Sequence, residues 1–149
     1  MKYLLDCDTC IGILGGSSVA RTTFESQPPD TMAITVLGYE ELRGMTWKFP
    51  DPLKWAKAFE ALSTCITVLP YDVLAAREAH RIKRDGELPA FRASDRMLLG
   101  VAITHHLTLV THRVDGFDEV PGLEIVDWMP DIPPYGAMAA PVVRSKKRA

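Results

Sequence analysis

The sequence predicts an α/β domain, a three-layer α/β/α sandwich with a mainly parallel central sheet. Short apolar runs alternate with helical patterns along the first 130 residues, an order typical of parallel strands covered by helices on both faces. The length of 149 residues allows one domain with a core that needs no disulfides. A hydrophobic fraction of 47% and a charged fraction of 24% are ordinary for a folded globular domain.

Strands are predicted where the apolar runs are short and continuous. Parallel strands covered on both faces show such runs, whereas half-exposed strands alternate apolar and polar residues. The predicted strands are residues 3–5, 32–36, 66–69, 107–110 and 123–126.

Helices are predicted between these strands, and several carry recognisable ends. Ser17 or Ser18 caps a helix that runs to about Ser26, and Asp51 with Pro52 opens another. A glycine pair at 15–16 ends the first helix. The full set is 9–14, 18–26, 37–45, 52–62, 72–84 and 95–106.

Charge and cysteine content exclude several classes of protein. The 17 basic and 19 acidic residues give a net charge of −2, which excludes a globally basic nucleic-acid coat but not a local basic patch. The sequence has no run of 18 apolar residues, so no membrane helix is predicted. The charged Asp6 comes too early for the apolar region of a signal peptide. Three cysteines do not make a disulfide framework, so we expect a reducing, cytoplasmic location.

The C-terminal segment 130–149 differs from the rest of the chain. It is rich in proline and small residues and ends in a short basic cluster. We expect this tail to be loose in the free chain, which leaves residues 1–129 as the folded domain.

Acidic residues recur at the predicted ends of strands. Asp6 follows the first strand directly, Glu40 and Glu41 lie in the helix after the second, Asp95 opens the helix before the fourth, and Asp115 lies in the loop after the fourth. Ligands of parallel sheets bind beyond the carboxyl ends of the strands. Carboxylates gathered there repel one another unless a cation lies between them, and Mg²⁺ or Mn²⁺ suits such oxygen ligands. Each acid taken alone has a plainer interpretation as a helix cap or a solvated surface group, Asp95 in particular as a cap.

Four segments together resemble a known family. They are residues 3–9 (Tyr-Leu-Leu-Asp-Cys-Asp-Thr), 34–36 with 40–44, 95–102, and 107–111 with 117–128. In their order and spacing these segments resemble PIN-domain ribonucleases, and most closely the VapC-like toxins of bacterial toxin–antitoxin pairs. The resemblance implies an endoribonuclease that depends on Mg²⁺ or Mn²⁺, forms a homodimer and is neutralised by a small antitoxin protein.

The resemblance also implies which acids hold the metal. Asp6, Glu40 and Asp95 match the three core acids of the family's motifs, with Glu40 four residues before Gly44. Asp115 is the best candidate for the fourth acid. Such acids hold an ion that activates water and stabilises the leaving oxygen in phosphodiester cleavage.

The segment after the fourth strand departs from the family pattern. The family often has Asn or Asp within two residues of the strand-four threonine, where this chain has His112 and Arg113 after Thr111. Thr111, His112 and Arg113 are predicted to contact a phosphate or a water molecule. Asp8 stands where the family often has Asn, and it adds a negative charge to the site.

Other interpretations stay open at this level. Cys7 and Cys10 have the spacing of a redox pair or half a zinc site, although small side chains filling a turn explain them as well. The basic helix face of Arg77, Arg81 and Arg84 suits an RNA backbone, an acidic antitoxin segment or plain solvent. At the level of function, the alternatives are a catalytically silent PIN-like domain that binds RNA or protein, a DNA nuclease and a ribosomal-RNA processing enzyme.

Overall fold

The computed structural model describes residues 1–84, 91–114 and 116–132. A five-stranded sheet lies at its centre, in the order β3-β2-β1-β4-β5, and every neighbouring pair of strands is parallel. The strands are β1 (Tyr3–Leu5), β2 (Met32–Thr35), β3 (Thr67–Leu69), β4 (Thr108–Val110) and β5 (Glu124–Val126). The predicted α/β fold with a parallel sheet is therefore confirmed, and each predicted strand is present to within a residue.

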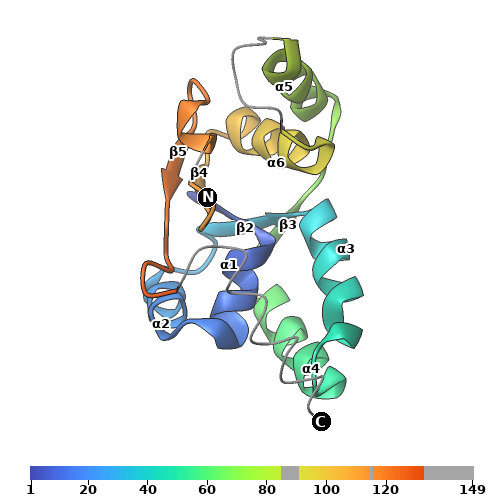
Figure 1. Cartoon of the computed structure of the whole chain (residues 1–149), viewed down its shortest axis with the longest axis vertical. Coiled ribbons are helices and arrows are strands. Elements are labelled where there is room, and N and C mark those ends of the chain that lie inside the picture. The colour runs from blue at the N-terminus through green and yellow to red at the C-terminus, as the bar shows by residue number, and fades with distance from the viewer. Residues whose placement is uncertain (85–90, 115, 133–149) are drawn as a thin grey trace.

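Helices cover both faces of this sheet (Figure 1). One face is covered by α5 (Val73–Arg84) and α6 (Ala93–Thr104). The opposite face is covered by α1 (Cys7–Ile11), the π-helical turn η1 (Gly12–Gly16), α2 (Ser18–Ser26), α3 (Val36–Met45) and α4 (Pro52–Ser63). Two short 3₁₀ turns complete the described elements, η2 (Thr46–Lys48) and η3 (Phe117–Glu119).

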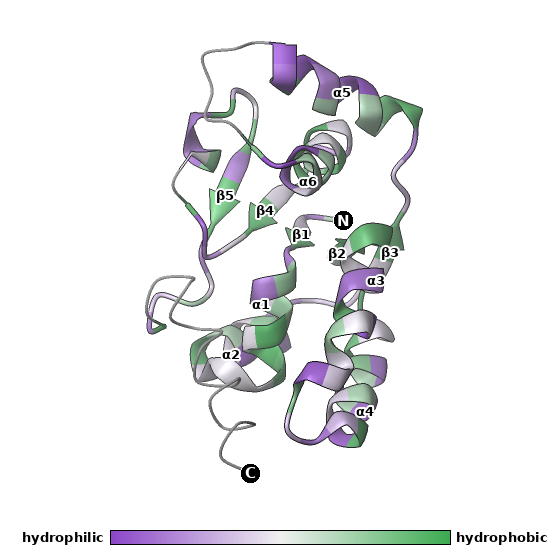
Figure 2. Ribbon diagram, turned by 45° about the vertical axis from the view of Figure 1, so that its right-hand side comes forward, coloured by the Kyte–Doolittle hydropathy of each residue, from purple (hydrophilic) through white to green (hydrophobic). Residues whose placement is uncertain are grey.

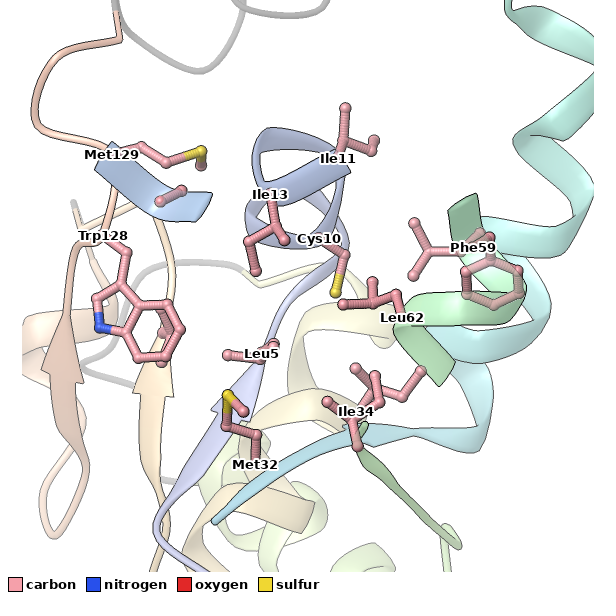
Figure 3. Packing of buried hydrophobic residues seen from close by; sticks show 14 of the residues in the cluster. Leu5, Cys10, Ile11, Ile13, Met32, Ile34, Phe59, Leu62, Trp128 and Met129 are labelled. Carbon is pink, nitrogen blue, oxygen red and sulfur yellow. The ribbon is translucent and has the colours of Figure 1, made fainter. Parts of the chain in front are cut away.

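The strands bury alternate side chains in two separate cores, one on each face of the sheet. Leu5 and Ile34 point into the larger core, where they meet α1, α4 and the segment at Trp128 and Met129 (Figure 3). Leu4 and Leu109 point the opposite way, against α5 and α6. In Figure 2 the strands are largely green, apart from a pale stretch of β4 and a purple stretch of β5, and the outer helix α5 is largely purple, as expected for a sheet between two layers.

Helix starts follow the capping signals in the sequence. The hydroxyl of Ser17 accepts a hydrogen bond from the N–H of Ala20 at 3.0 Å, and the carboxylate of Asp51 accepts one from the N–H of Lys54 at 3.2 Å. Each bond satisfies an amide that the first turn of a helix leaves without a partner. Thr35 caps α3 in the same way, since its hydroxyl accepts a hydrogen bond from the N–H of Gly38 at 2.9 Å.

Helix α6 begins two residues earlier than its predicted start at Asp95. Arg92 occupies the cap position and makes no side-chain capping bond, so Asp95 lies inside the first turn. The interpretation of Asp95 as a helix cap is therefore wrong, and this carboxylate is available for other contacts. Gly100 brings α6 close to α5, because a Cβ at that position would lie 2.4 Å from the carbonyl oxygen of Ala75.

Two sequence predictions fall outside the described residues. They are the loose tail, of which only residues 130–132 are described, and the position of Asp115. Among the described helices, none has the length and apolar character needed to cross a membrane.

Candidate active site: an acid pocket at the strand ends

A cavity of about 140 Å³ opens where β1, β2 and β4 end. Its walls come from the β1–α1 junction, the first turns of α3, the start of α6 and the loop after β4. We call it the acid pocket. Its charged lining residues are Asp6, Asp8, Glu41, Asp95, Arg92 and Arg113.

Asp6 is the buried carboxylate at the end of β1. One of its oxygens accepts a hydrogen bond from the N–H of Thr9 at 2.8 Å, so Asp6 also caps α1. Burial raises the pKa of Asp6, and hydrogen bonds from Thr111 and Thr9 partly offset that effect. The position of this carboxylate is thus fixed by its cap, while its negative charge is left poorly solvated.

Asp8 adds a second carboxylate in the first turn of α1. Burial, together with repulsion from Asp6, raises the pKa of Asp8 from 3.8 to about 7, although Arg113 acts in the opposite direction. A carboxyl group with such a pKa is an indicator of uncompensated negative charge in a cleft. A bound cation would relieve it.

Glu41, and not Glu40, is the α3 acid that lines the acid pocket. The thiol of Cys7 lies 3.3 Å from Oε2 of Glu41 and donates to it. Glu40 is exposed and is not among the lining residues. The assignment of Glu40 as a metal-holding acid therefore stays a prediction, and in this structure its neighbour Glu41 is the one that lines the pocket. The signal that would have found Glu41 is helical spacing from the Thr35 cap, since residues 35, 38, 41 and 45 all line the pocket.

Asp95 is held by an arginine from the opposite wall. Arg113 donates from Nη1 to Oδ1 of Asp95 at 2.9 Å and from Nη2 to Oδ2 at 3.2 Å, a bidentate ion pair. The guanidinium also lies 5.0 Å from the ring centroid of Phe117. Arg92, whose side chain is 71% exposed, approaches Asp95 more loosely at 3.7 Å. No sequence pattern predicts this pairing, apart from the departure from the family pattern at residue 113.

The other two residues predicted after β4 lie beside the pocket and do not line it. Thr111 is fully buried, and its side chain hydrogen-bonds to Asp6. Nδ1 of His112 lies 3.0 Å from Oδ2 of Asp127 after β5, so this ring is turned toward that carboxylate. Of the three residues predicted to contact phosphate or water, Arg113 is the one in the pocket wall.

The pocket has the donor chemistry of a magnesium or manganese site. Four carboxylates, two of them with raised pKa values, are the hard oxygen donors that these ions prefer. Among the described residues, however, no three Asp, Glu, His or Cys side chains converge closely enough to chelate an ion as they stand. The residues fit the ion in kind, and ion binding would require Asp95 and its neighbours to move.

The two cysteines of α1 do not suit redox or nucleophilic chemistry. Burial and the nearby carboxylates raise the pKa of the Cys7 thiol, and burial raises that of Cys10. Because the thiolate is the reactive form, the raised pKa values disfavour nucleophilic chemistry at both thiols. Filling the turn after β1 accounts for both.

The predicted basic face of α5 is present. Arg77, Arg81 and Arg84 line one shallow groove together with Val73 and Glu78, and Glu78 pairs with Arg81 at 2.8 Å. The groove lies on α5, away from the residues that line the acid pocket.

Comparisons with known proteins point in one direction. No family model matches the sequence. The chain is 25% identical over 130 residues to the tRNA(fMet)-specific endonuclease VapC of Salmonella typhimurium, covering 86% of this chain and 98% of that protein. The DNA-bound VapBC structure from the same organism aligns at a TM-score of 0.71 and 29% identity, covering 86% of this chain and 98% of that one. VapBC-1 from nontypeable Haemophilus influenzae shares the fold at a TM-score of 0.69 and 22% identity, over 86% and 98% of the two chains.

The fold, with its parallel sheet, is similar to that of PIN-like VapC structures. In sequence and in fold the chain is VapC-like, as both the sequence relative and the structural neighbours indicate. The resemblance seen in the sequence motifs is therefore confirmed.

Proposed function

We propose that this chain is the toxin of a toxin–antitoxin pair, an endoribonuclease that hydrolyses RNA phosphodiester bonds with the help of Mg²⁺ or Mn²⁺. The observation that carries the proposal is the acid pocket, which Asp6, Asp8, Glu41 and Asp95 line together at the strand ends of a VapC-like fold. A VapC relative is a tRNA(fMet)-specific endonuclease, so initiator tRNA is the first substrate to test.

Each pocket residue has a distinct part in this chemistry. Asp6, Asp95 and Glu41 or Asp8 would hold the ion, which lowers the pKa of water and stabilises the leaving oxygen. Asp6 is kept in place by its cap on Thr9 and by Thr111, so no reorientation of this carboxylate is needed at the moment of reaction. Arg113 presents a guanidinium at the pocket wall, a group suited to phosphate oxygens.

The partners and the location belong to the same proposal. The solved relatives are VapBC complexes, which supports a small antitoxin as the protein partner of this chain. We also propose that the chain forms a homodimer and acts in the cytoplasm, where its RNA substrates are. The domain would comprise residues 1–129, with the C-terminal segment 130–149 outside it.

A second candidate is a catalytically silent PIN-like domain that binds RNA or protein. The ion pair between Asp95 and Arg113 favours it, because it engages both oxygens of one of the acids that would hold a metal. No set of three carboxylates converges among the described residues, which agrees with that alternative as well.

Cleavage of RNA by the purified full chain separates the two candidates. Total tRNA and ribosomal RNA would be incubated with the chain, freed of any antitoxin, in EDTA, Mg²⁺ or Mn²⁺. Discrete products that need the ion are expected. Asp6→Asn should abolish them while leaving the fold intact, because asparagine caps a helix about as well as aspartate does.

Glu40→Gln serves as the control, since it replaces a carboxylate by an amide on α3, at a residue that does not line the pocket. If folded protein cleaves none of these RNAs under any ion, the silent domain becomes the better description. Cleavage that survives Asp6→Asn would remove Asp6 from the site.

A further inference from the structure

Arg113 places a permanent positive charge inside a pocket of carboxylates. Its two terminal nitrogens bond both oxygens of Asp95, at 2.9 and 3.2 Å. The same charge reaches Asp6 and Asp8, since it lowers the pKa of each against the effect of burial. A guanidinium stays protonated at any physiological pH, so this cation cannot be titrated away.

The geometry of the ion pair between Arg113 and Asp95 disfavours the binding of a second cation at Asp95. A carboxylate offers about four lone-pair directions, and a bidentate guanidinium takes two of them. An ion bound between Asp6 and Asp95 would also lie beside the guanidinium, and like charges a few ångströms apart in a partly buried site repel strongly. The side chain of Asp95 is 8% exposed and that of Arg113 29%, so solvent screens this repulsion only in part.

We infer that the guanidinium of Arg113 takes the place of one metal ion in the acid pocket. The pocket then binds one divalent ion rather than two. It also binds that ion more weakly than the carboxylates would without Arg113. The inference rests on the proposed function, which supplies the ion. It concerns the number of ions and their affinity, which the proposed function leaves undetermined.

Titration of the full-length chain with Mn²⁺ tests the inference without any RNA. Calorimetry or the electron paramagnetic resonance signal of free Mn²⁺ gives both the number of ions and the dissociation constant. The wild-type chain should bind one ion in the pocket. Arg113→Gln should bind Mn²⁺ at least tenfold more tightly, whereas Arg113→Lys, which keeps the charge, should stay within about threefold of wild type.

Arg92→Gln is the matched control. Arg92 also approaches Asp95, but at 3.7 Å and with a side chain that is 71% exposed, so its removal should change the Mn²⁺ affinity less than threefold. If Arg92→Gln tightened binding as much as Arg113→Gln did, general surface charge would explain the effect and the specific role of Arg113 would be overturned.

Two further results would overturn the inference. One is the binding of two Mn²⁺ ions in the pocket of the wild-type chain. This measurement needs no variant, so it remains decisive even if Arg113→Gln fails to fold. The other is equal Mn²⁺ affinity in wild type and Arg113→Gln. If RNA cleavage is then still abolished by EDTA, only the inference fails. If no chain binds Mn²⁺ and cleavage resists EDTA, the metal dependence in the proposed function fails with it.

Discussion

Replacing Asp8 by asparagine should raise the free energy of unfolding of the metal-free chain. The gain should develop as the pH rises from about 4 to about 7. The pKa of Asp8 is raised from 3.8 to about 7 in the folded state by burial and by Asp6. At 1.36 kcal/mol per pKa unit this is at most about 4 kcal/mol against the charged form. Partial solvent exposure and the loss of a favourable charge in the first turn of α1, about 0.3–1 kcal/mol, reduce the expected gain to about 1–3 kcal/mol.

The sign of the pH dependence follows from the raised pKa. Well below the unfolded pKa of 3.8 this carboxyl group is protonated in both folded and unfolded chains, so the charge of Asp8 makes no difference between Asp8→Asn and wild type there. As the pH rises toward 7 the unfolded chain ionises freely and the folded chain does not, so wild type loses stability that the variant keeps. Above about pH 7 the difference is constant.

Urea unfolding in EDTA at pH 4.5, 6 and 8, followed by circular dichroism, measures this difference. Glu40→Gln is the control, because that exposed carboxylate lies outside the pocket and should give no such trend. Adding Mg²⁺ at pH 8 should shrink the gap between Asp8→Asn and wild type. A gap that does not change with pH, or a variant that is less stable at pH 8, would refute the reasoning about buried charge.

Three other substitutions test separate parts of the structure. Glu41→Gln should lower RNA cleavage at least tenfold, and Glu40→Gln should leave it unchanged. If Glu40→Gln lowered cleavage and Glu41→Gln did not, Glu40 would be the α3 acid of the site. Gly100→Ala should lower the free energy of unfolding by about 2–3 kcal/mol, because the new methyl group meets the carbonyl of Ala75, and a neutral result in thermal unfolding would show that α5 can move away. Asp127→Ala should cost about 1–2 kcal/mol in urea unfolding, since its carboxylate accepts hydrogen bonds from a buried ring and a backbone amide; no loss would mean that water replaces those bonds.

The sheet and most helix starts were predictable because their signals are local. Continuous apolar runs marked the strands, and short polar side chains such as Ser17 and Asp51 marked the helix caps. The position of the first acid was also predictable, since a carboxylate that directly follows a buried parallel strand lies at the edge of the sheet where ligands bind. Asp6 was found on that ground.

The remainder of the site depends on tertiary contacts that residue types do not determine. The choice between Glu40 and Glu41 follows from the rotation of α3, which its cap at Thr35 sets. The pair of Asp95 with Arg113 joins a helix to a loop across β4, and no local pattern tells which way the arginine turns. The placement of Asp115 lies outside the described residues.

The central position of β1 has a consequence for how the protein is made. The first strand of the chain pairs with β4, and the hydroxyl of Thr9 bonds the carbonyl oxygen of Val110, 101 residues later. At a synthesis rate of about 5–20 residues per second, several seconds pass between the synthesis of β1 and that of β4. A nascent chain on the ribosome therefore holds Asp6 without Arg113 and without the wall formed by α6. The acid pocket can therefore assemble only after the segment that carries Arg113 and Phe117 has left the ribosome.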